Sequence, residues 1–143
     1  MDAATILKAK GGQVYTVRPE DTLEEAARIL AERGIGCLVV SERPGEMTGI
    51  LSERDIVREI ALGGAGRLKS RVADAMTRAV FSCRSSDTID QLLGEMTTRR
   101  HRHIPVVENG RLMGLVSIGD VVKLRLAEAE METAAMRAYI TTG

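Results

Sequence analysis

Two short segments of the sequence carry a serine and an aspartate at the same spacing. Ser52 and Asp55 belong to the segment Gly-Ile-Leu-Ser-Glu-Arg-Asp, and Ser117 and Asp120 belong to the segment Gly-Leu-Val-Ser-Ile-Gly-Asp. In each, two β-favouring residues precede the serine and an apolar helical periodicity follows it. A strand therefore leads directly into a helix N-terminus, where unpaired backbone N–H groups and the positive end of the helix dipole can bind an anion.

The same spacing also has a purely structural explanation. Ser-x-x-Asp is a helix-capping pattern, in which the serine oxygen accepts a backbone N–H and the acidic side chain reaches back to the start of the helix. Capping alone is the better explanation of a single copy. Two copies in matching context favour an additional role in binding.

The composition is that of an ordinary globular protein. The chain has 143 residues, of which 44% are hydrophobic and 28% charged, and its 20 basic and 20 acidic residues cancel. A net charge of zero gives no general attraction to nucleic acid or to an anionic membrane, and two tyrosines and one phenylalanine are too few for a base-stacking surface. We therefore expect neither nucleic acid nor membrane as a partner.

Features that bear on the compartment point to the cytoplasm. The N-terminal segment lacks the apolar stretch of a secretory signal, and no segment has the ~20 apolar residues that span a bilayer. Cys37 and Cys83 lie in apolar, strand-like runs without a Cys-x-x-Cys pair or a metal-ligand spacing. We expect both to be buried thiols in a reducing compartment.

The chain repeats itself with an offset of 65 to 67 residues, as the pairs Thr22/Thr88, Val40/Val107 and Gly49/Gly114 show. After a weakly helical segment 2–10, the first half is predicted to contain strands at 14–17, 37–40 and 47–51, with helices after Thr22 and after Ser52. The second half is predicted to have strands at 80–83, 104–107 and 111–116, with helices from 87 and from 121 to 139. The inward faces are predicted at residues 23, 26, 27 and 30, at 56, 57, 60 and 61, and at 89, 92, 93 and 96.

This order of elements predicts an α/β (α+β) fold made of two pseudo-twofold-related β-α-β-β-α repeats. Each repeat has too little core to stand alone, so the two are expected to pack face to face as one module. The expected units are repeat 1 at 12–66, repeat 2 at 72–128 and a C-terminal helical extension at 129–143. The extension is expected to contact another subunit, the alternative being its own domain.

The doubled pattern resembles a tandem pair of CBS (cystathionine-β-synthase-type) domains over roughly residues 12–128, without an attached enzyme. The resemblance rests on Asp-Thr-Leu/Ile at the start of each first helix, on the two Gly-Leu/Ile-x-Ser-x-x-Asp segments, and on His103-Ile104-Pro105-Val106. It implies a regulatory module that binds adenosine nucleotides in a cleft between the repeats. It also implies a homodimer shaped like a flat disc.

The resemblance further implies roles for individual residues. Asp55 and Asp120 take the place of the ribose-binding aspartate, and Ser52 and Ser117 that of the hydroxyl beside the phosphate. A carboxylate can accept hydrogen bonds from both ribose hydroxyls, and a helix N-terminus suits a phosphate. Thr16 and Ser82 correspond to a strand-one hydroxyl that meets the purine or phosphate, or else they only satisfy backbone at a strand end.

A cationic segment in the second half extends from Arg99 to His103, and the resemblance directs Arg102 and His103 towards phosphate. The alternative is a solvated loop whose cations offset a helix dipole. The first half has Gly34-Ile35-Gly36 there instead, and Arg54 is its candidate cation. We therefore expect two unequal sites. A metal site at the two histidines is disfavoured because the chain has no third histidine, so no metal is expected.

The function predicted from these features is nucleotide sensing. The expected ligand is AMP, ADP, ATP or NAD(H), and the expected output is regulation of an unidentified protein. The alternative is a structural or oligomerisation module without a physiological nucleotide. An enzyme is not expected, because the sequence shows no nucleophile–base constellation, glycine-rich phosphate loop or metal cluster.

Overall fold

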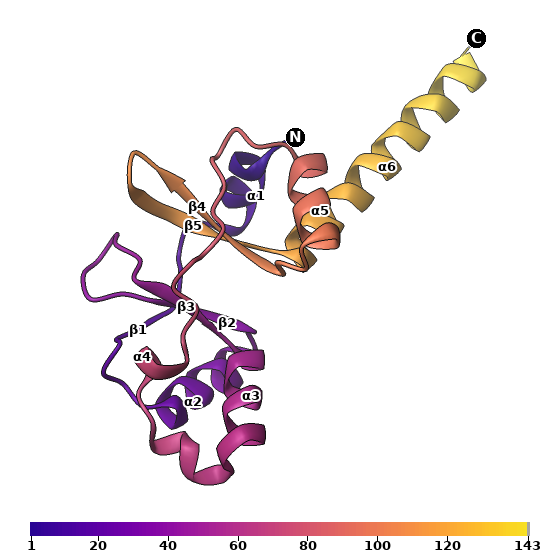
Figure 1. Ribbon diagram of the computed structural model, residues 1–143. Helices are drawn as coiled ribbons and strands as arrows, with labels where there is room; N and C mark the ends of the chain where they lie inside the picture. Colours follow the sequence, from indigo (N-terminus) through magenta and orange to yellow (C-terminus); the bar gives the residue numbers. More distant parts are fainter. Residues whose placement is uncertain (143) are drawn as a thin grey trace.

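The computed structural model describes residues 1–142, which form two halves that meet at a narrow waist (Figure 1). The first half contains β1 (Thr16–Val17), α2 (Leu23–Arg33), β2 (Cys37–Val40), β3 (Gly49–Ser52), α3 (Glu53–Gly63), the 3₁₀ helix η1 (Ala65–Lys69) and α4 (Val72–Ala75). The second contains α1 (Ala3–Lys10), α5 (Ile89–Thr98), β4 (His103–Glu108), β5 (Arg111–Ser117) and α6 (Ile118–Thr142). The predicted α+β fold with two repeats is confirmed.

Each half is built on a small sheet. In the first half β2 lies between β1, to which it is parallel, and β3, to which it is antiparallel. In the second half β4 and β5 form an antiparallel hairpin. Asn109 and Gly110 turn this hairpin with φ angles of 51° and 76°, the left-handed conformation that a tight hairpin turn requires.

The strand predicted at 80–83 does not form, and only Cys83 makes an isolated parallel bridge to Val106. Proline explains the difference from the first half. There, the Val39 N–H donates to the carbonyl of Tyr15 over 3.1 Å. The Val107 N–H donates to the carbonyl of Cys83 as the Ser41 N–H donates to that of Val17, so Pro105 takes the place of Val39 in the structure. Proline has no N–H to donate, and the ladder cannot continue from Cys83 towards Phe81.

The two halves exchange their leading helices. Helix α1 precedes the first repeat in sequence but lies against β5 and α6 of the second half, whereas α4 precedes the second repeat and packs on the first (Figure 1). A corresponding backbone hydrogen bond holds each of the two exchanged helices on the half that it joins. The Ala3 N–H donates to the carbonyl of Asp87 over 2.9 Å, and the Val72 N–H donates to the carbonyl of Asp21 over 2.7 Å.

The hydrophobic cores show why this exchange matters. The core of the second half includes Ala3 and Ile6 of α1, and the core of the first half includes Val72 of α4. Predicted inward residues of α2 and α5 also contribute to the cores, with Leu23, Leu30, Ile89 and Met96 buried. Each half thus needs a segment from outside its own sequence repeat, so the packing units differ from the ranges 12–66 and 72–128.

The inward face predicted for α3 is wrong in part. Ile56 is buried, but Val57 is 64% exposed and Ile60 is 37% exposed. The cause is the N-terminal cap, which turns Asp55 back towards the end of β3 and buries it. The buried side of the helix therefore runs through Asp55 and Ile56, and Val57 points away from it.

The glycine that begins each repeated segment allows another segment to cross a strand closely. A Cβ at Gly49 would lie 2.6 Å from the carbonyl oxygen of Thr77, in the connection between the halves. A Cβ at Gly114 would lie 2.5 Å from Cδ2 of Leu7 in α1. Both contacts are closer than a real Cβ tolerates, so Gly49 makes room for the connection between the halves and Gly114 makes room for helix α1.

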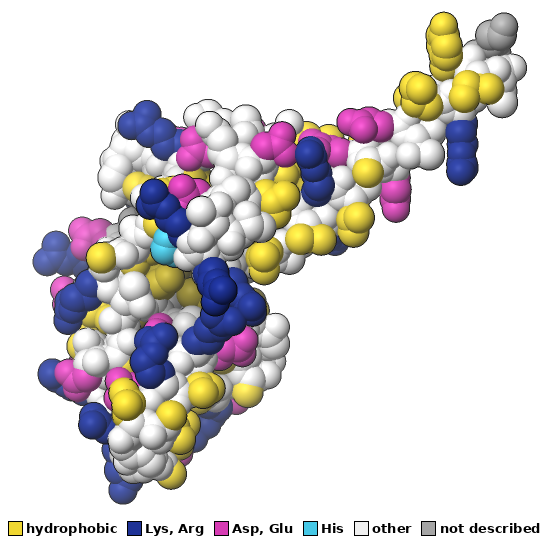
Figure 2. All heavy atoms as spheres, turned by 45° about the vertical axis from the view of Figure 1, so that its right-hand side comes forward, with side chains coloured by type: hydrophobic (Ala, Val, Ile, Leu, Met, Phe, Trp, Pro, Cys, Tyr) yellow, Lys and Arg dark blue, Asp and Glu magenta, His cyan; other side chains and the backbone are white. Residues whose placement is uncertain are grey.

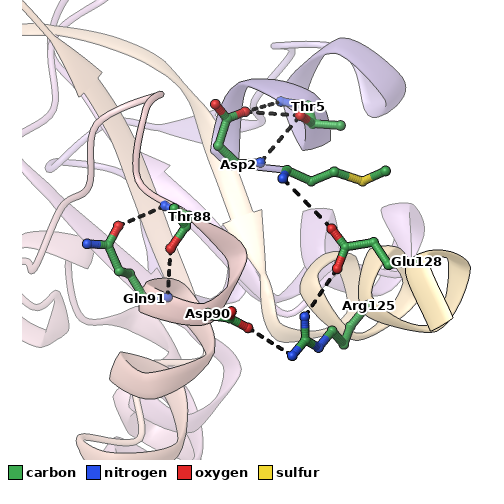
Figure 3. Close-up of polar contacts among 8 residues, drawn as sticks. Asp2, Thr5, Thr88, Asp90, Gln91, Arg125 and Glu128 are labelled. Carbon is green, nitrogen blue, oxygen red and sulfur yellow. Dashed lines mark hydrogen bonds and ion pairs between the residues drawn. The ribbon is translucent and has the colours of Figure 1, made fainter. Parts of the chain in front are cut away.

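Helix α6 is anchored near its N-terminal end only. Val121 is buried in the second core, and Arg125 forms ion pairs with Asp90 of α5 at 3.1 Å and with Glu128 at 3.2 Å (Figure 3). The N-terminal amine lies 3.8 Å from the other oxygen of Glu128 (Figure 3). From residue 129 to 141 every side chain is exposed, and the helix projects away from the body (Figure 1). No helix among residues 1–142 is long and apolar enough to cross a bilayer.

Candidate functional site

A cavity of about 440 Å³ lies between the two halves. Its lining combines both repeats and α1: Lys10, Gln13, Val14, Tyr15, Gly34, Ile35, Gly36, Cys37, His103, Leu115, Ser117 and Asp120. Figure 2 shows the surface hollowed where the halves meet, with one histidine in the hollow and a group of lysine and arginine side chains beside it. The start of α6 in one repeat thus faces the segment before β2 in the other.

Asp120 and Ser117 form the predicted cap at the start of α6. The Ser117 N–H donates to Oδ2 of Asp120 over 2.9 Å, and the Asp120 N–H donates to Oγ of Ser117 over 3.2 Å. The structural explanation of the motif is therefore correct as far as it goes. The cap uses only one of the two carboxylate oxygens, because no hydrogen bond found among residues 1–142 involves Oδ1 of Asp120.

Lys10 is a site residue that the sequence analysis missed. Its ammonium group donates to Oδ2 of Asp120 over 2.7 Å and to the carbonyl of Leu115 over 2.9 Å. Burial alone would raise the pKa of Asp120, but the hydrogen bonds from Lys10 and Ser117 outweigh it and hold that pKa below its ordinary value. Asp120 is thus an ionised carboxylate at neutral pH, with one oxygen occupied by the protein itself.

His103 stands at the centre of the waist, opposite Gly36. A Cβ at Gly36 would lie 3.4 Å from Cε1 of His103 and 3.3 Å from Oε1 of Glu53. Burial lowers the pKa of His103, Lys10 and Arg102 lower it further, and the carboxylates of Glu53 and Asp120 oppose them. His103 therefore faces the cavity as a neutral imidazole at pH 7, which offers a hydrogen bond and not the positive charge expected for phosphate.

We predict that His103 makes the protein less stable in mild acid. Because its pKa in the folded state lies below the ordinary 6.5, the unfolded chain takes up the proton first as the pH falls. The free energy of unfolding should be constant above about pH 7 with respect to this group, and should decrease as the pH falls below 6.5. Urea unfolding of wild type and His103→Gln between pH 5 and 7.5 measures the difference.

In the His103→Gln protein the free energy of unfolding should fall less steeply with decreasing pH than in wild type. The His101→Gln protein should retain the part of this pH dependence that His103 contributes. Equal slopes in wild type and His103→Gln would show that the ring is already hydrated in the folded protein.

The first Ser-x-x-Asp segment has the same cap with a different environment. The Ser52 N–H donates to Oδ2 of Asp55 over 2.9 Å, and the Asp55 N–H donates to Oγ of Ser52 over 3.3 Å. Asp55 is only 6% exposed, and the exposed Arg58 reaches its Oδ1 at 3.3 Å. Neither Ser52 nor Asp55 lines the cavity that contains Asp120.

Of the nine residues predicted for the site, the cavity brings together His103, Ser117 and Asp120. The remaining four outside the first cap have exposed side chains elsewhere: Thr16, Arg54, Ser82 and Arg102. Arg102 instead contributes its backbone, because its carbonyl accepts the N–H of Ile118 over 2.8 Å.

The segment Gly34–Gly36 before β2 is the other part of the site that the analysis of motifs did not assign. It was noted only for lacking a charge, yet its two glycines have no side chain to fill the space opposite Asp120, and Ile35 lines that space. Tyr15 lines the cavity beside them, with the guanidinium of Arg33 4.8 Å from its ring centre. The sequence signal that could have identified this segment was its difference from the cationic segment at the same place in the second repeat.

Neither cysteine is a reactive thiol in the described structure. Cys37 lines the cavity, but burial, aided by the charge of Asp55, raises the pKa of its thiol to about 12. Burial likewise raises the pKa of Cys83 to about 12, and the prediction of two buried free thiols is confirmed. Among residues 1–142, no group of three His, Cys, Asp or Glu side chains is placed to hold a metal ion.

Comparison with known proteins identifies the repeats. The sequence profile described as "CBS domain" matches residues 12–62 and 72–127. The mitochondrial CBS domain-containing protein CBSX3 of Arabidopsis thaliana is 33% identical over 147 aligned positions, which cover 96% of this chain and 71% of that protein.

Solved structures agree with this assignment. The CBS-domain protein ATU1752 of Agrobacterium tumefaciens is 46% identical with a TM-score of 0.84, over 87% of this chain and 99% of that one. The CBS domain pair of MJ0100, crystallised with 5′-methylthioadenosine and S-adenosylmethionine, is 25% identical with a TM-score of 0.76. The match covers 87% of this chain and 98% of that one. The chain described here therefore belongs to the CBS-domain family and carries two copies of the domain in tandem.

Proposed function

We propose that this protein is a regulatory module that binds an adenosine-containing ligand in the cavity between its two CBS repeats. The observation that carries the proposal is the carboxylate of Asp120. It is ionised, held at a helix start, and has Oδ1 without a partner among the described residues, at the wall of a cavity of about 440 Å³. Ribose hydroxyls are strong donors to such a carboxylate.

The remaining walls suit a nucleoside. Val14, Ile35 and Leu115 supply apolar surface for a purine, and the volume lies in the range of small-molecule pockets. The MJ0100 pair binds 5′-methylthioadenosine and S-adenosylmethionine, and these two compounds share an adenosine. This supports an adenosine as the common part of the ligand here.

The charges support different ligands for the two carboxylates. Cys37 pairs with Ser52 and His103 with Ser117 at the same places in the two sheets, an offset of 66 residues between Cys37 and His103. The uncharged segment Gly34–Gly36 that faces Asp120 therefore corresponds to the cationic segment Arg100–Arg102. The pseudo-twofold relation therefore assigns that cationic segment to Asp55, together with Arg54 beside it. We infer that a phosphorylated ligand, AMP, ADP, ATP or NAD(H), belongs at the Asp55 side, and a ligand with less negative charge at the Asp120 side.

Regulation would follow from contact with both halves. A ligand shifts an equilibrium only by its difference in affinity for the two states, and a ligand between the repeats contacts both. The regulated protein is a partner still to be identified, and catalysis is not part of the proposal. Two buried free thiols support the expected cytoplasmic location.

The proposal predicts stabilisation by ligand. Thermal unfolding should be measured with AMP, ADP, ATP, NAD(H), 5′-methylthioadenosine and S-adenosylmethionine. A ligand at a hundred times its Kd adds ~2.7 kcal/mol, which should raise the Tm of a domain of this size by roughly 5–10 °C. Guanosine analogues serve as controls. No shift with any adenosine compound would favour the alternative, an interaction module without a ligand.

A further inference from the structure

The exposed part of α6 carries an apolar stripe with the spacing of a coiled coil. Positions separated alternately by four and three residues are all apolar or small: Val122, Leu126, Ala129, Thr133, Met136 and Ile140. This is the spacing of the a and d positions of a heptad repeat. Leu126 and Met136 are each 61% exposed, and Ile140 is 71% exposed.

Nothing in the part of the chain that the structure describes covers this stripe. Helix α6 uses a different side, which includes Val121 and Leu124, to pack on the second core. Beyond Glu128 the helix projects from the body without covering elements (Figure 1). An exposed helix of this length gains little stability from its backbone alone, and an a/d stripe is the feature that a partner helix buries.

We propose that the stripe is occupied by α6 of a second copy of this chain, in a parallel, in-register, two-stranded coiled coil. With Leu126, Thr133 and Ile140 at a and Val122, Ala129 and Met136 at d, each position meets the same position of the partner. Small residues at Ala129 and Thr133 let the two helices approach closely in the middle of the stripe.

The flanking charges match a parallel arrangement. In a parallel coiled coil, a residue at g faces the residue five positions further on, at e of the partner, and charged residues there set partner choice and orientation. Glu132 at g then faces the partner's Arg137. Arg125 at g, which also pairs with Asp90 and Glu128 of its own chain, faces the partner's Glu130. Both contacts join opposite charges, and the twofold axis repeats each of them.

The same charges oppose an antiparallel arrangement. Pairing all six stripe residues in that orientation brings e against e and g against g. Glu130 would then face the partner's Glu130, and Glu132 the partner's Glu132. Lys123 would face the partner's Arg137. Because these contacts join like charges, electrostatics select the parallel orientation.

Disulfide cross-linking in the full-length protein tests the proposal. Cys37 and Cys83 are buried with a thiol pKa of about 12, so an engineered cysteine on α6 is the reactive one. The Thr133→Cys protein should form a covalent dimer under mild oxidation, since position a meets position a. The matched control is Met131→Cys, which is 62% exposed in wild type but lies outside the stripe.

Failure of Thr133→Cys to cross-link more than Met131→Cys would overturn the proposal. A mixture of Ala129→Cys and Thr133→Cys proteins that cross-links only between the two variants would overturn the parallel orientation and indicate the antiparallel one.

A charge exchange gives a second, independent test. Glu132→Arg alone and Arg137→Glu alone should each raise the dissociation constant of the dimer about 5- to 30-fold, because two attractive contacts become repulsive. The double variant should restore wild-type association, measured by analytical ultracentrifugation. Additive weakening in the double variant, or no change in either single variant, would contradict the pairing of these residues. All these side chains are exposed, so the variants are expected to fold.

Discussion

Replacing Asp120 by alanine should weaken the binding of an adenosine ligand to the cavity about 10- to 150-fold. Hydrogen bonds to a charged group contribute ~1.5–3 kcal/mol, and Asp120 is the ionised acceptor at the cavity wall. Calorimetric titration of wild type and Asp120→Ala with the ligand that gives the largest thermal shift measures the loss. The variant also loses a helix cap, so the titration should be done at a temperature well below the Tm of the variant.

Two further substitutions make this result specific. Asp74→Ala removes a carboxylate on α4 that pairs only with the exposed Arg71 among the contacts of the described residues, and it should leave the affinity unchanged. Asp55→Ala should remove a different binding event and leave the one at Asp120, because Asp55 does not line this cavity. An unchanged affinity in Asp120→Ala would refute the assignment of this carboxylate to the ligand.

Ile6→Ala should lower the free energy of unfolding by ~2–4 kcal/mol. Ile6 is 5% exposed and belongs to the core of the second half, although α1 precedes the first repeat in sequence. Removing three carbons from a buried isoleucine leaves a cavity as well as losing burial. Urea unfolding monitored by circular dichroism measures the change.

The control for this substitution is Leu62→Ala, which removes a side chain 74% exposed on α3 and should change stability by less than ~0.5 kcal/mol. A similarly small effect of Ile6→Ala would mean that α1 detaches from the second half in solution. In that case Lys10, which α1 places on Asp120, would leave the cavity too, and ligand binding would respond to mutations in α1.

The sequence allowed accurate prediction of most elements whose cause is local. Ser52 and Ser117 cap α3 and α6 as their spacing indicates, and Gly34 ends α2 in the left-handed conformation. The repeat of apolar positions located the helices and both cores, because residues three and four apart share a helix face. The fold class followed from these elements and their order.

Two predictions failed, one because of a distant partner and one because of a local cap. The strand at 80–83 required an N–H from position 105, on another strand, where proline has none. The inward face of α3 depended on how its cap oriented Asp55. On α3 the apolar pattern itself misled, because Val57 and Ile60 are exposed. At 80–83 the apolar run gave no sign of the proline on the neighbouring strand.

The two related halves, the capped helix after a strand in each and the aspartate in each cap are all readable from the order of residues. Which segments meet those aspartates depends on how the chain folds in three dimensions. Lys10 reaches Asp120 across 110 positions of the chain, and the cavity joins the helix start of one repeat to Gly34–Gly36 of the other. Local periodicity carries no information about such contacts, because they arise from the way the halves exchange α1 and α4 and face each other across the waist.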